Sequence, residues 1–320
     1  MGEYGISDKV PLLSGAHLDN MAAATSAGVA TTTLDDIVAE VQRVEAAGFA
    51  FYAVPSIFSL DAIGMLTVAG RETQRIELVT AVVPTPPRHP LAMAQQALTA
   101  QAASGGRFTL GIGLSHKVVI EDMCGLSYAR PARQMREYLR ALVPLLEGKP
   151  AAVDGELYRV HAALDVAGGT PVPVLVAALG PRMLQVAGEL AHGTSTWMTG
   201  LSTLSNHVVP TLRRAAEAAG RSAPRVQSAV PIALCADPGA AREVCNQVFS
   251  IYGKLPSYRA MLDREGAALP GELALVGDEA VLREGLRRYR EAGVTDFSPS
   301  IFPADAGAVE RTFAFLQSEL

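Results

Sequence analysis

Residues 107–116, Arg-Phe-Thr-Leu-Gly-Ile-Gly-Leu-Ser-His, carry the clearest chemical signal in the sequence. Their apolar first part predicts a buried strand that ends in a Gly-x-Gly pair, Gly111 and Gly113. Two glycines one residue apart let backbone N–H groups approach a bulky anionic ligand, because no Cβ stands in the way. Ser115 and His116 follow, and they supply a hydroxyl for a phosphate and an imidazole for proton transfer. The segment therefore predicts ligand binding at a strand end, with a helix-capping serine and a structural histidine as the alternatives.

A second candidate ligand site lies at residues 179–182, Leu-Gly-Pro-Arg, directly after another apolar stretch. Pro181 suits the first position of a helix, where its missing N–H costs no hydrogen bond. Gly180 leaves the backbone open, and Arg182 adds positive charge at the helix N-terminus, where anions bind. The pattern favours a phosphate cradle over an ordinary turn with a solvated arginine.

Other residues at the ends of expected strands are weaker candidates. Trp197, the only tryptophan, would either fill the core or form a wall against a planar ligand. The remaining polar candidates, each placed after an expected strand, are His17, Asp19, Asn20, Arg88 and His89. We expect the first three to form a polar loop, with substrate contact as the alternative, and the last two to contact the tail of a ligand.

The sequence contains no motif for a metal site or for a protein nucleophile. No His, Cys, Asp and Glu residues have metal-ligand spacing, and neither a G-x-S-x-G elbow nor a P-loop lysine occurs. Cys124, Cys235 and Cys245 are widely spaced and predict buried, reduced thiols. An enzyme built on this chain would therefore rely on a bound organic cofactor.

The composition points to an α/β protein that acts on small molecules. Of the 320 residues, 49% are hydrophobic and 18% are charged, which suits strands that are buried on both faces. The net charge of −5 and the lack of a basic run argue against nucleic acid as a partner. The N-terminus lacks the pattern of a signal peptide, and no apolar run is long enough to span a membrane. These features predict a soluble cytoplasmic protein.

Strands and helices alternate along most of the chain. Thr33-Leu-Asp-Asp opens the first clear helix with a capping box, and Gly48 ends it before a strand at 49–54. Further strands are expected at 76–83, 107–116, 172–177, 194–198, 226–234 and about 294–297, and further helices at 60–70, 90–104, 181–191, 202–219 and 238–252. With a first strand placed at 10–14, about eight strand–helix units result.

This count predicts one domain over residues 1–320, folded as a TIM-like (β/α) eight-stranded barrel rather than an open doubly wound sheet. The spacing between strands is loosest at about 118–171 and 236–292. We expect these segments to be insertions at the C-terminal face of the barrel that shape its mouth, the first with a hairpin at 153–158.

Four segments, at residues 45–49, 77–92, 102–116 and 174–183, together resemble the bacterial luciferase-like monooxygenase superfamily. Within it they are most similar to oxidoreductases that depend on the deazaflavin coenzyme F420. The resemblance implies a TIM-like barrel, usually a homodimer, with the tricyclic ring of the coenzyme at the C-terminal ends of the strands. It also implies a non-prolyl cis peptide between Ala81 and Val82 that bulges against the ring. The further cofactor-binding residues that it implies are Gly111, Gly113, Ser115, His116, Gly180, Pro181, Arg182, Trp197 and Met198.

The chain departs from this family at two positions that commonly carry an acid or base. Pro55-Ser56 stands where many members have Asp or His, and Ser115-His116 stands where many have Glu. Ser56 and His116 are therefore the catalytic candidates. We expect hydride transfer toward an unsaturated or carbonyl-bearing substrate, with a proton from His116 or water. The alternatives are an FMN-dependent monooxygenase that uses molecular oxygen and a barrel that binds flavin without catalysis.

Overall fold

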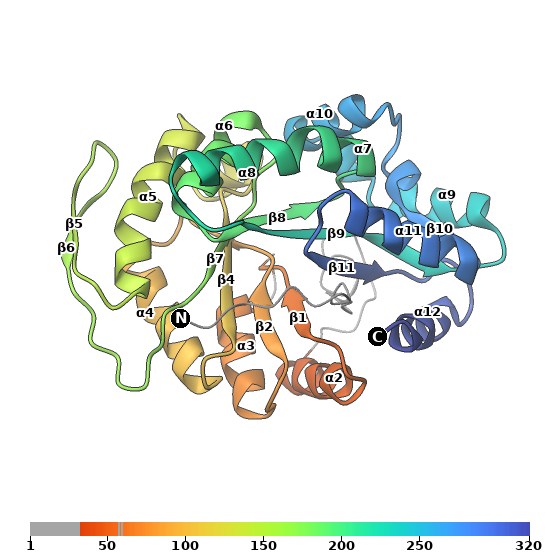
Figure 1. The fold of residues 1–320 in the computed structure, drawn as a ribbon, viewed down its shortest axis with the longest axis horizontal. Coiled ribbons are helices and arrows are strands. Elements are labelled where there is room, and N and C mark those ends of the chain that lie inside the picture. Colours follow the sequence, from red (N-terminus) through yellow and green to blue (C-terminus); the bar gives the residue numbers. More distant parts are fainter. Residues whose placement is uncertain (1–32, 57, 59) are drawn as a thin grey trace.

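The computed structural model describes residues 33–56, 58 and 60–320. Within this part of the chain nine strands pair into one parallel sheet: β1 (Phe51–Val54), β2 (Glu77–Thr80), β3 (Val83–Pro84), β4 (Phe108–Gly113), β7 (Val174–Val176), β8 (Gly193–Trp197), β9 (Arg225–Leu234), β10 (Leu275–Gly277) and β11 (Asp296–Ile301). Their order is β1-β2-β4-β7-β8-β9-β10, with β3 beside β4 and β11 beside β9. Figure 1 shows the sheet curled into a nearly closed barrel, which confirms the expected TIM-like fold.

The helices lie around the outside of this barrel (Figure 1). They are α2 (Leu34–Ala46), α3 (Ala62–Arg71), α4 (Pro90–Ala103), α5 (Pro131–Leu146), α6 (Pro181–Leu190), α7 (Leu201–Thr203), α8 (Val209–Ala218), α9 (Pro238–Val248), α10 (Pro256–Glu265), α11 (Glu279–Glu291) and α12 (Ala308–Ser318). The expected capping box opens α2, where Thr33 accepts the N–H of Asp36 and Asp36 accepts the N–H of Thr33. No helix in the described ranges has both the length and the apolar character needed to cross a bilayer.

The strand expected at 76–83 is divided into β2 and β3, because the chain bulges at Ala81 and Val82. The helix expected at 202–219 is likewise divided into α7, the π-helical turn η2 (Leu204–Val208) and α8. The first strand, expected at 10–14, lies outside the described residues. No pairing between β11 and β1 occurs among the residues that the structure describes.

The segment at 118–171 contains the π-helical turn η1 (Val118–Met123), α5 and an antiparallel hairpin of β5 (Ala151–Asp154) and β6 (Arg159–Ala162). The expected hairpin is therefore confirmed, and it stands beside α5 in Figure 1. The segment at 236–292 contains α9, the 3-10 turn η3 (Ser250–Gly253), α10 and the 3-10 turn η4 (Pro270–Leu273). It also contains β10 and α11, and β10 joins the sheet beside β9. Three residues are too few to show strand periodicity in a sequence, so β10 was not expected.

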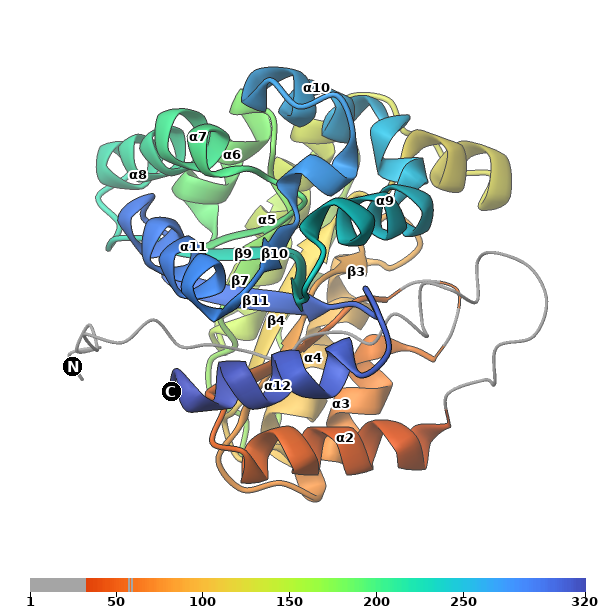
Figure 2. The same cartoon turned by 90° about the vertical axis from the view of Figure 1, so that its right-hand side faces the viewer.

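Two hydrophobic clusters hold these elements together. The larger cluster packs the outer face of the sheet against the surrounding helices, and it includes Phe108 on β4 and Leu142 on α5. The smaller cluster lies beneath α9 and α10 and includes Met198, Phe249 and Phe302. Figure 2 shows α9 and α10 together on one side of the barrel. The second cluster therefore fixes the later insertion to the strands whose ends it adjoins.

One end of the barrel interior is filled by charged side chains from distant strands. Arg225 on β9 pairs with Glu77 on β2 at 2.8 Å and with Asp296 on β11 at 2.8 Å, and Thr109 on β4 donates to Glu77. Because β2 and β9 are not neighbours in the sheet, these groups meet across the interior. Burial lowers the pKa of Arg225, but Glu77 and Asp296 together raise it above its ordinary value. We call these four residues the charged plug.

Candidate functional site

The charged plug identifies the inner face of every strand, because register partners in a sheet point to the same side. Arg225 is the register partner of Gly193 on β8, Gly193 of Leu175 on β7, and Leu175 of Gly111 on β4. Alternation then gives the other inward-facing positions along each strand. The Arg225 end of the barrel is thus closed, and the composition of the inner face changes toward the opposite end.

Small residues line the inner face toward the C-terminal ends of the strands. By alternation they are Ala53, Gly111, Gly113, Ala177, Ser195, Ala229, Ser298 and Ser300. Ala177, Ser195 and Ala229 are only half-buried although they lie in or next to central strands. Solvent therefore reaches the inner face at this end, which is where (β/α) barrels bind their ligands. We call this region the mouth.

A bulge stands at the mouth between β2 and β3. The Ala81–Val82 peptide bond is cis, as the resemblance implied. An added Cβ at Gly111 would lie 1.8 Å from the Thr80 carbonyl oxygen, and one at Gly113 would lie 2.9 Å from Cγ2 of Val82. The Thr80 hydroxyl also donates to the Gly111 carbonyl and accepts the Gly111 N–H, both at 2.8 Å. The chain at the bulge, rather than a ligand, therefore approaches these two glycines closely. The Gly111 N–H already donates to the Thr80 hydroxyl.

Ser115 and His116 lie where β4 ends, as expected. Ser115 has a left-handed backbone (φ 59°), and its carbonyl accepts the Tyr128 hydroxyl at 3.0 Å. The His116 carbonyl accepts the N–H groups of Val119 and Ile120, so its backbone is held just before η1. The imidazole is half-buried, and burial lowers its pKa below the ordinary value. His116 is therefore mainly neutral at neutral pH and gains a proton only under acidic conditions.

Ser56 lies next to the bulge. Its N–H donates to the Val82 carbonyl at 3.3 Å, and the Ala81 N–H donates to the Val54 carbonyl at 2.8 Å. The ends of β1 and β2 are therefore joined through these backbone bonds, which bring a half-buried serine beside Val82.

The Gly-Pro-Arg turn lies at the start of α6, as the sequence predicted. Gly180 is the N-cap residue and Pro181 the first helical residue, and no side chain caps the helix. Among the described residues no heavy atom lies within 4 Å of where a Gly180 Cβ would stand. The preceding Leu179 carbonyl is held by the buried His207 ring at 2.8 Å. The turn is thus fixed in place, while its N-terminal amides and Arg182 remain exposed to a ligand.

Trp197 ends β8 and Met198 directly follows it. Trp197 belongs to an aromatic group that sequence reasoning missed. Its ring lies 5.4 Å from Phe249 and 5.8 Å from Tyr252. Tyr252 lies 4.8 Å from Tyr258, and Tyr258 lies 5.8 Å from the His116 ring. We call His116, Trp197, Phe249, Tyr252 and Tyr258 the aromatic wall. Its only signal in the sequence is three aromatic residues within ten positions of a chain that is 6% aromatic.

Other sequence candidates have structural partners instead. Arg88 forms an ion pair with Asp61, and His89 caps α4 by accepting the Leu91 N–H at 3.3 Å. Their contact with the tail of a ligand stays a prediction. His17, Asp19 and Asn20 lie outside the described residues. The prediction of buried thiols is right for Cys235 and Cys245 and wrong for Cys124, which is exposed.

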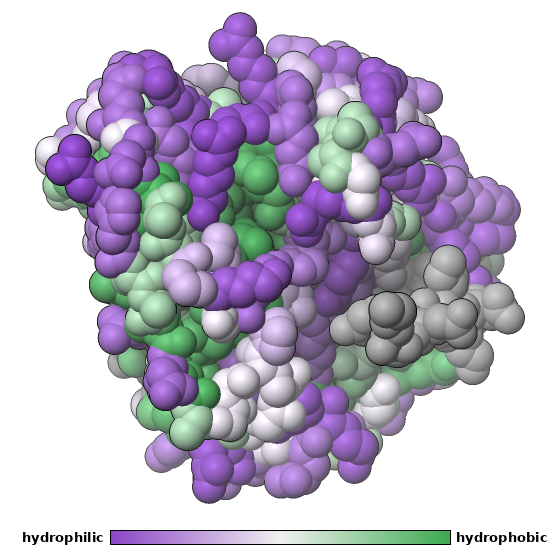
Figure 3. All heavy atoms as spheres, turned by 60° about the vertical axis from the view of Figure 1, so that its left-hand side comes forward, coloured by the Kyte–Doolittle hydropathy of each residue, from purple (hydrophilic) through white to green (hydrophobic). Residues whose placement is uncertain are grey.

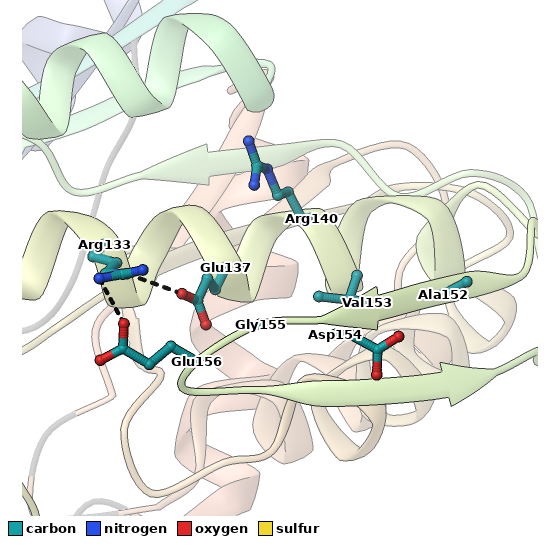
Figure 4. A pocket seen from close by; sticks show the side chains of 8 residues that line it. All are labelled: Arg133, Glu137, Arg140, Ala152, Val153, Asp154, Gly155 and Glu156. Atoms are coloured by element: carbon teal, nitrogen blue, oxygen red, sulfur yellow. Dashed lines mark hydrogen bonds and ion pairs between the residues drawn. The ribbon is translucent and has the colours of Figure 1, made fainter.

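Two surface grooves lie away from the strand ends. One, of about 380 Å³, lies between α5 and the hairpin (Figure 4). Figure 3 shows apolar patches among hydrophilic residues on this side of the molecule. In this groove Arg133 joins Glu137 and Glu156, and Glu137 accepts the Leu157 N–H at 2.7 Å. These contacts hold the hairpin on α5. The other, of about 510 Å³, lies between α7, α10 and α11. The mouth remains the candidate site.

Two sequence relatives indicate the kind of protein to which this chain is similar. An uncharacterised protein of Mycobacterium tuberculosis is 30% identical over 216 residues, which cover 63% of this chain and 64% of that protein. The F420-dependent glucose-6-phosphate dehydrogenase of Kineococcus radiotolerans is 27% identical over 235 residues, which cover 72% of this chain and 68% of that enzyme. The first of these matches spans less than two thirds of the relative's own length.

A solved structure and a family model agree with the fold. The coenzyme F420 dependent tetrahydromethanopterin reductase from Methanopyrus kandleri superposes with a TM-score of 0.77 and 23% identity, over 90% of this chain and 95% of that one. The sequence model of the luciferase-like monooxygenase family matches residues 16–296. Since this match spans most of the chain, the protein belongs to the luciferase-like monooxygenase family.

Proposed function

We propose that the protein is an oxidoreductase that uses deazaflavin coenzyme F420 to reduce a small unsaturated or carbonyl-bearing organic substrate. The observation that carries the proposal is the mouth itself, where small, half-buried inner-face residues lie between the bulge and the open Gly180 turn. A flat tricyclic ring needs such a wall of small side chains, and its phosphate needs free backbone amides. A relative named as an F420-dependent dehydrogenase supports the choice of coenzyme.

The residues at the mouth fit the parts of such a coenzyme. The uncapped first turn of α6, with Gly180, Pro181 and Arg182, would hold the phosphate. Ala81 and Val82 would support the ring from below, and Trp197 with Met198 would border it on the β8 side. Gly113 and Ser115 adjoin the same edge of the sheet. When bound, the deazaflavin supplies or accepts a hydride at a ring carbon.

His116 is the proposed proton donor of the reduction. Burial lowers the pKa of its imidazole, so the protonated ring is a stronger acid than an ordinary imidazolium and gives up its proton more readily. Its backbone is held by two N–H groups, and its ring packs 5.8 Å from the Tyr258 ring just after the end of β4. Ser56 lies beside Val82 of the bulge, and its hydroxyl would be available for a hydrogen bond to the substrate or the coenzyme.

Coenzyme titration tests the proposal. We expect oxidised or reduced F420 to bind with a Kd of about 1–10 μM, followed by the absorbance of the deazaflavin. Failure of both redox forms to bind saturably would reject the proposal. Light scattering on the same samples would test the homodimer that the resemblance implies.

The alternative is an FMN-dependent monooxygenase, which the description of the matching family favours. FMN and the deazaflavin absorb at different wavelengths, so the visible spectrum of the purified protein separates the two. Oxygen uptake during turnover, together with binding of FMN in preference to F420, would support the alternative.

A further inference from the structure

The later insertion contributes a side chain that contacts the proposed proton donor. The ring of Tyr258, in the first turn of α10, lies 5.8 Å from the His116 ring, with an angle of 52° between the two planes. This separation is typical of paired aromatic side chains. Because His116 follows β4, the contact joins the end of a barrel strand to a segment far away in the chain.

The His116 ring has no hydrogen bond that would fix its orientation. Among the described residues, neither ring nitrogen has a hydrogen-bond partner, and burial alone lowers the pKa of the imidazole. In catalytic histidines a second group usually holds the ring through the nitrogen that does not react. Within the described part of the chain, the contact with the Tyr258 ring is therefore what limits rotation of the imidazole.

Tyr258 is itself held firmly. The Tyr252 ring packs edge-on against it at 4.8 Å, with an angle of 83° between the planes. Arg259, the next residue of α10, donates to the carbonyls of Ala267 and Ala268, both at distances below 3 Å.

Glu265, at the end of α10, adds a second anchor. It accepts the N–H groups of Ser202 and Thr203 at 3.0 and 2.7 Å, and the Thr203 hydroxyl at 2.7 Å. These contacts tie α10 to α7. Tyr258 therefore meets His116 from a helix that is held along its length.

The charged residues around this contact are paired with one another. On η1 and α10 the ion pairs are those of Lys117 with Glu121 and of Arg259 with Asp263. The neighbouring phenols stay uncharged at neutral pH, because burial raises the pKa values of Tyr128, Tyr252 and Tyr258. The aromatic ring is thus the group that can respond to a charge on His116.

We propose that Tyr258 is a positioning residue, which orients the His116 ring for proton donation and stabilises its protonated form. A cation within about 6 Å of an aromatic ring centre is attracted to the electron-rich ring face. The imidazolium gains this attraction and the neutral imidazole does not, so Tyr258 opposes the effect of burial. After the proton has passed to the substrate, the neutral ring takes another from water. The role in catalysis rests on the proposed function, whereas the contact concerns this chain alone.

An NMR titration of the full-length protein without added coenzyme tests the contact. The chain has six histidines, and the signal that is lost in His116→Gln identifies His116. Tyr258→Leu removes the ring but keeps a large apolar side chain, so the pKa of His116 should fall by about 0.5. Tyr258→Phe keeps the ring and should restore the value. An unchanged or higher pKa in Tyr258→Leu would overturn the inference.

Phe249→Leu is the matched control. Phe249 belongs to the same aromatic wall, but its ring packs against Trp197 and Tyr252 instead of His116. The His116 pKa should therefore be unchanged in this variant, and an equal fall in both leucine variants would contradict the inference. A nuclear Overhauser effect between the His116 and Tyr258 rings needs no variant, and its absence would rule out the contact itself.

The pH profile of turnover tests the role in catalysis, with reduced F420 and cyclohexenone, a compound that is both unsaturated and carbonyl-bearing. Tyr258→Leu should lower kcat about tenfold at neutral pH with little change in KM, and the rise in rate should move to lower pH. Tyr258→Phe should recover both. A lowered kcat with an unmoved pH profile would show that Tyr258 has only a structural role.

The two proposals can fail separately. If F420 binds and the His116 pKa is the same with and without the Tyr258 ring, the coenzyme assignment stands and the positioning role is wrong. If the His116 pKa falls as expected while F420 does not bind, Tyr258 controls the imidazole and the proposed coenzyme is wrong.

Discussion

The two ends of the same strands are built from opposite kinds of residue. At one end Arg225, Glu77 and Asp296 fill the interior with paired charges from strands that are not all neighbours. At the other end most inner-face residues are alanine, glycine or serine, with Trp197 among them, and solvent reaches this face. The barrel thus separates the contacts that stabilise it from the surface that is free to bind a ligand. The variants that follow test whether substitutions at the closed end change stability and whether substitutions at the mouth change ligand binding or catalysis.

The largest effect is expected at the closed end. Arg225→Met leaves Glu77 and Asp296 close together without their cation, and removing one partner of a buried ion pair costs about 3–5 kcal/mol. The free energy of unfolding, measured with urea, should fall by that amount. Arg283→Met, which removes an exposed ion pair with Glu319, should change it little. Equal losses in the two variants would show that the plug has no special role.

A second variant alters the support of the bulge. Gly111→Ala places a Cβ 1.8 Å from the Thr80 carbonyl oxygen, so the bulge must move. We expect a loss of about 3 kcal/mol in stability together with weaker coenzyme binding, because both depend on the same packing. Gly180→Ala is the control, since the space around its Cβ is open. Normal stability in Gly111→Ala would contradict the packing described above.

The protonation of His116 should make the rate of reduction at the mouth depend on pH. Because burial lowers its pKa, the protonated donor forms only as the pH falls below the ordinary histidine value, and reduction should therefore accelerate toward acidic pH. His116→Gln should lower kcat about 100-fold and remove this dependence. His161→Gln, which alters an exposed histidine on the hairpin, should retain the rate and the pH profile. A pH profile that survives in His116→Gln would assign the proton to water.

The smallest effect is expected at the start of α6. Gly180→Asp and Gly180→Asn both supply a capping side chain of the same shape, and the open space accommodates either. Only Asp adds a negative charge where the coenzyme phosphate is proposed to bind, so it should weaken F420 binding about tenfold relative to Asn. The difference should shrink at high salt. Equal F420 affinities would place the phosphate elsewhere.

Much of the fold could be predicted from local patterns in the sequence. The capping box at Thr33, the hairpin near Gly155 and most strand–helix units depend on residues within one turn or one strand. The position of the bulge at Ala81 and Val82 came from family resemblance, since no local pattern indicates it.

The contacts that define the site could not be predicted in this way. The His116–Tyr258 contact joins residues far apart in the chain, and the register that faces Trp197 inward depends on β9. From the sequence alone, Gly111 was predicted to make room for a ligand. The group that it contacts, the Thr80 carbonyl, can be identified only once β2 and β4 are paired. Long-range pairing therefore decides which of several plausible roles a residue takes.

The Glu265 carboxylate has a consequence for how molecules enter and leave the barrel. A carboxylate with three donors from the α7 turn would lose about 1.5–3 kcal/mol for each bond broken, so swinging α10 outward is unfavourable. We therefore expect the later insertion to stay in place rather than to open and close. The rate of product release should accordingly be insensitive to motions of α10.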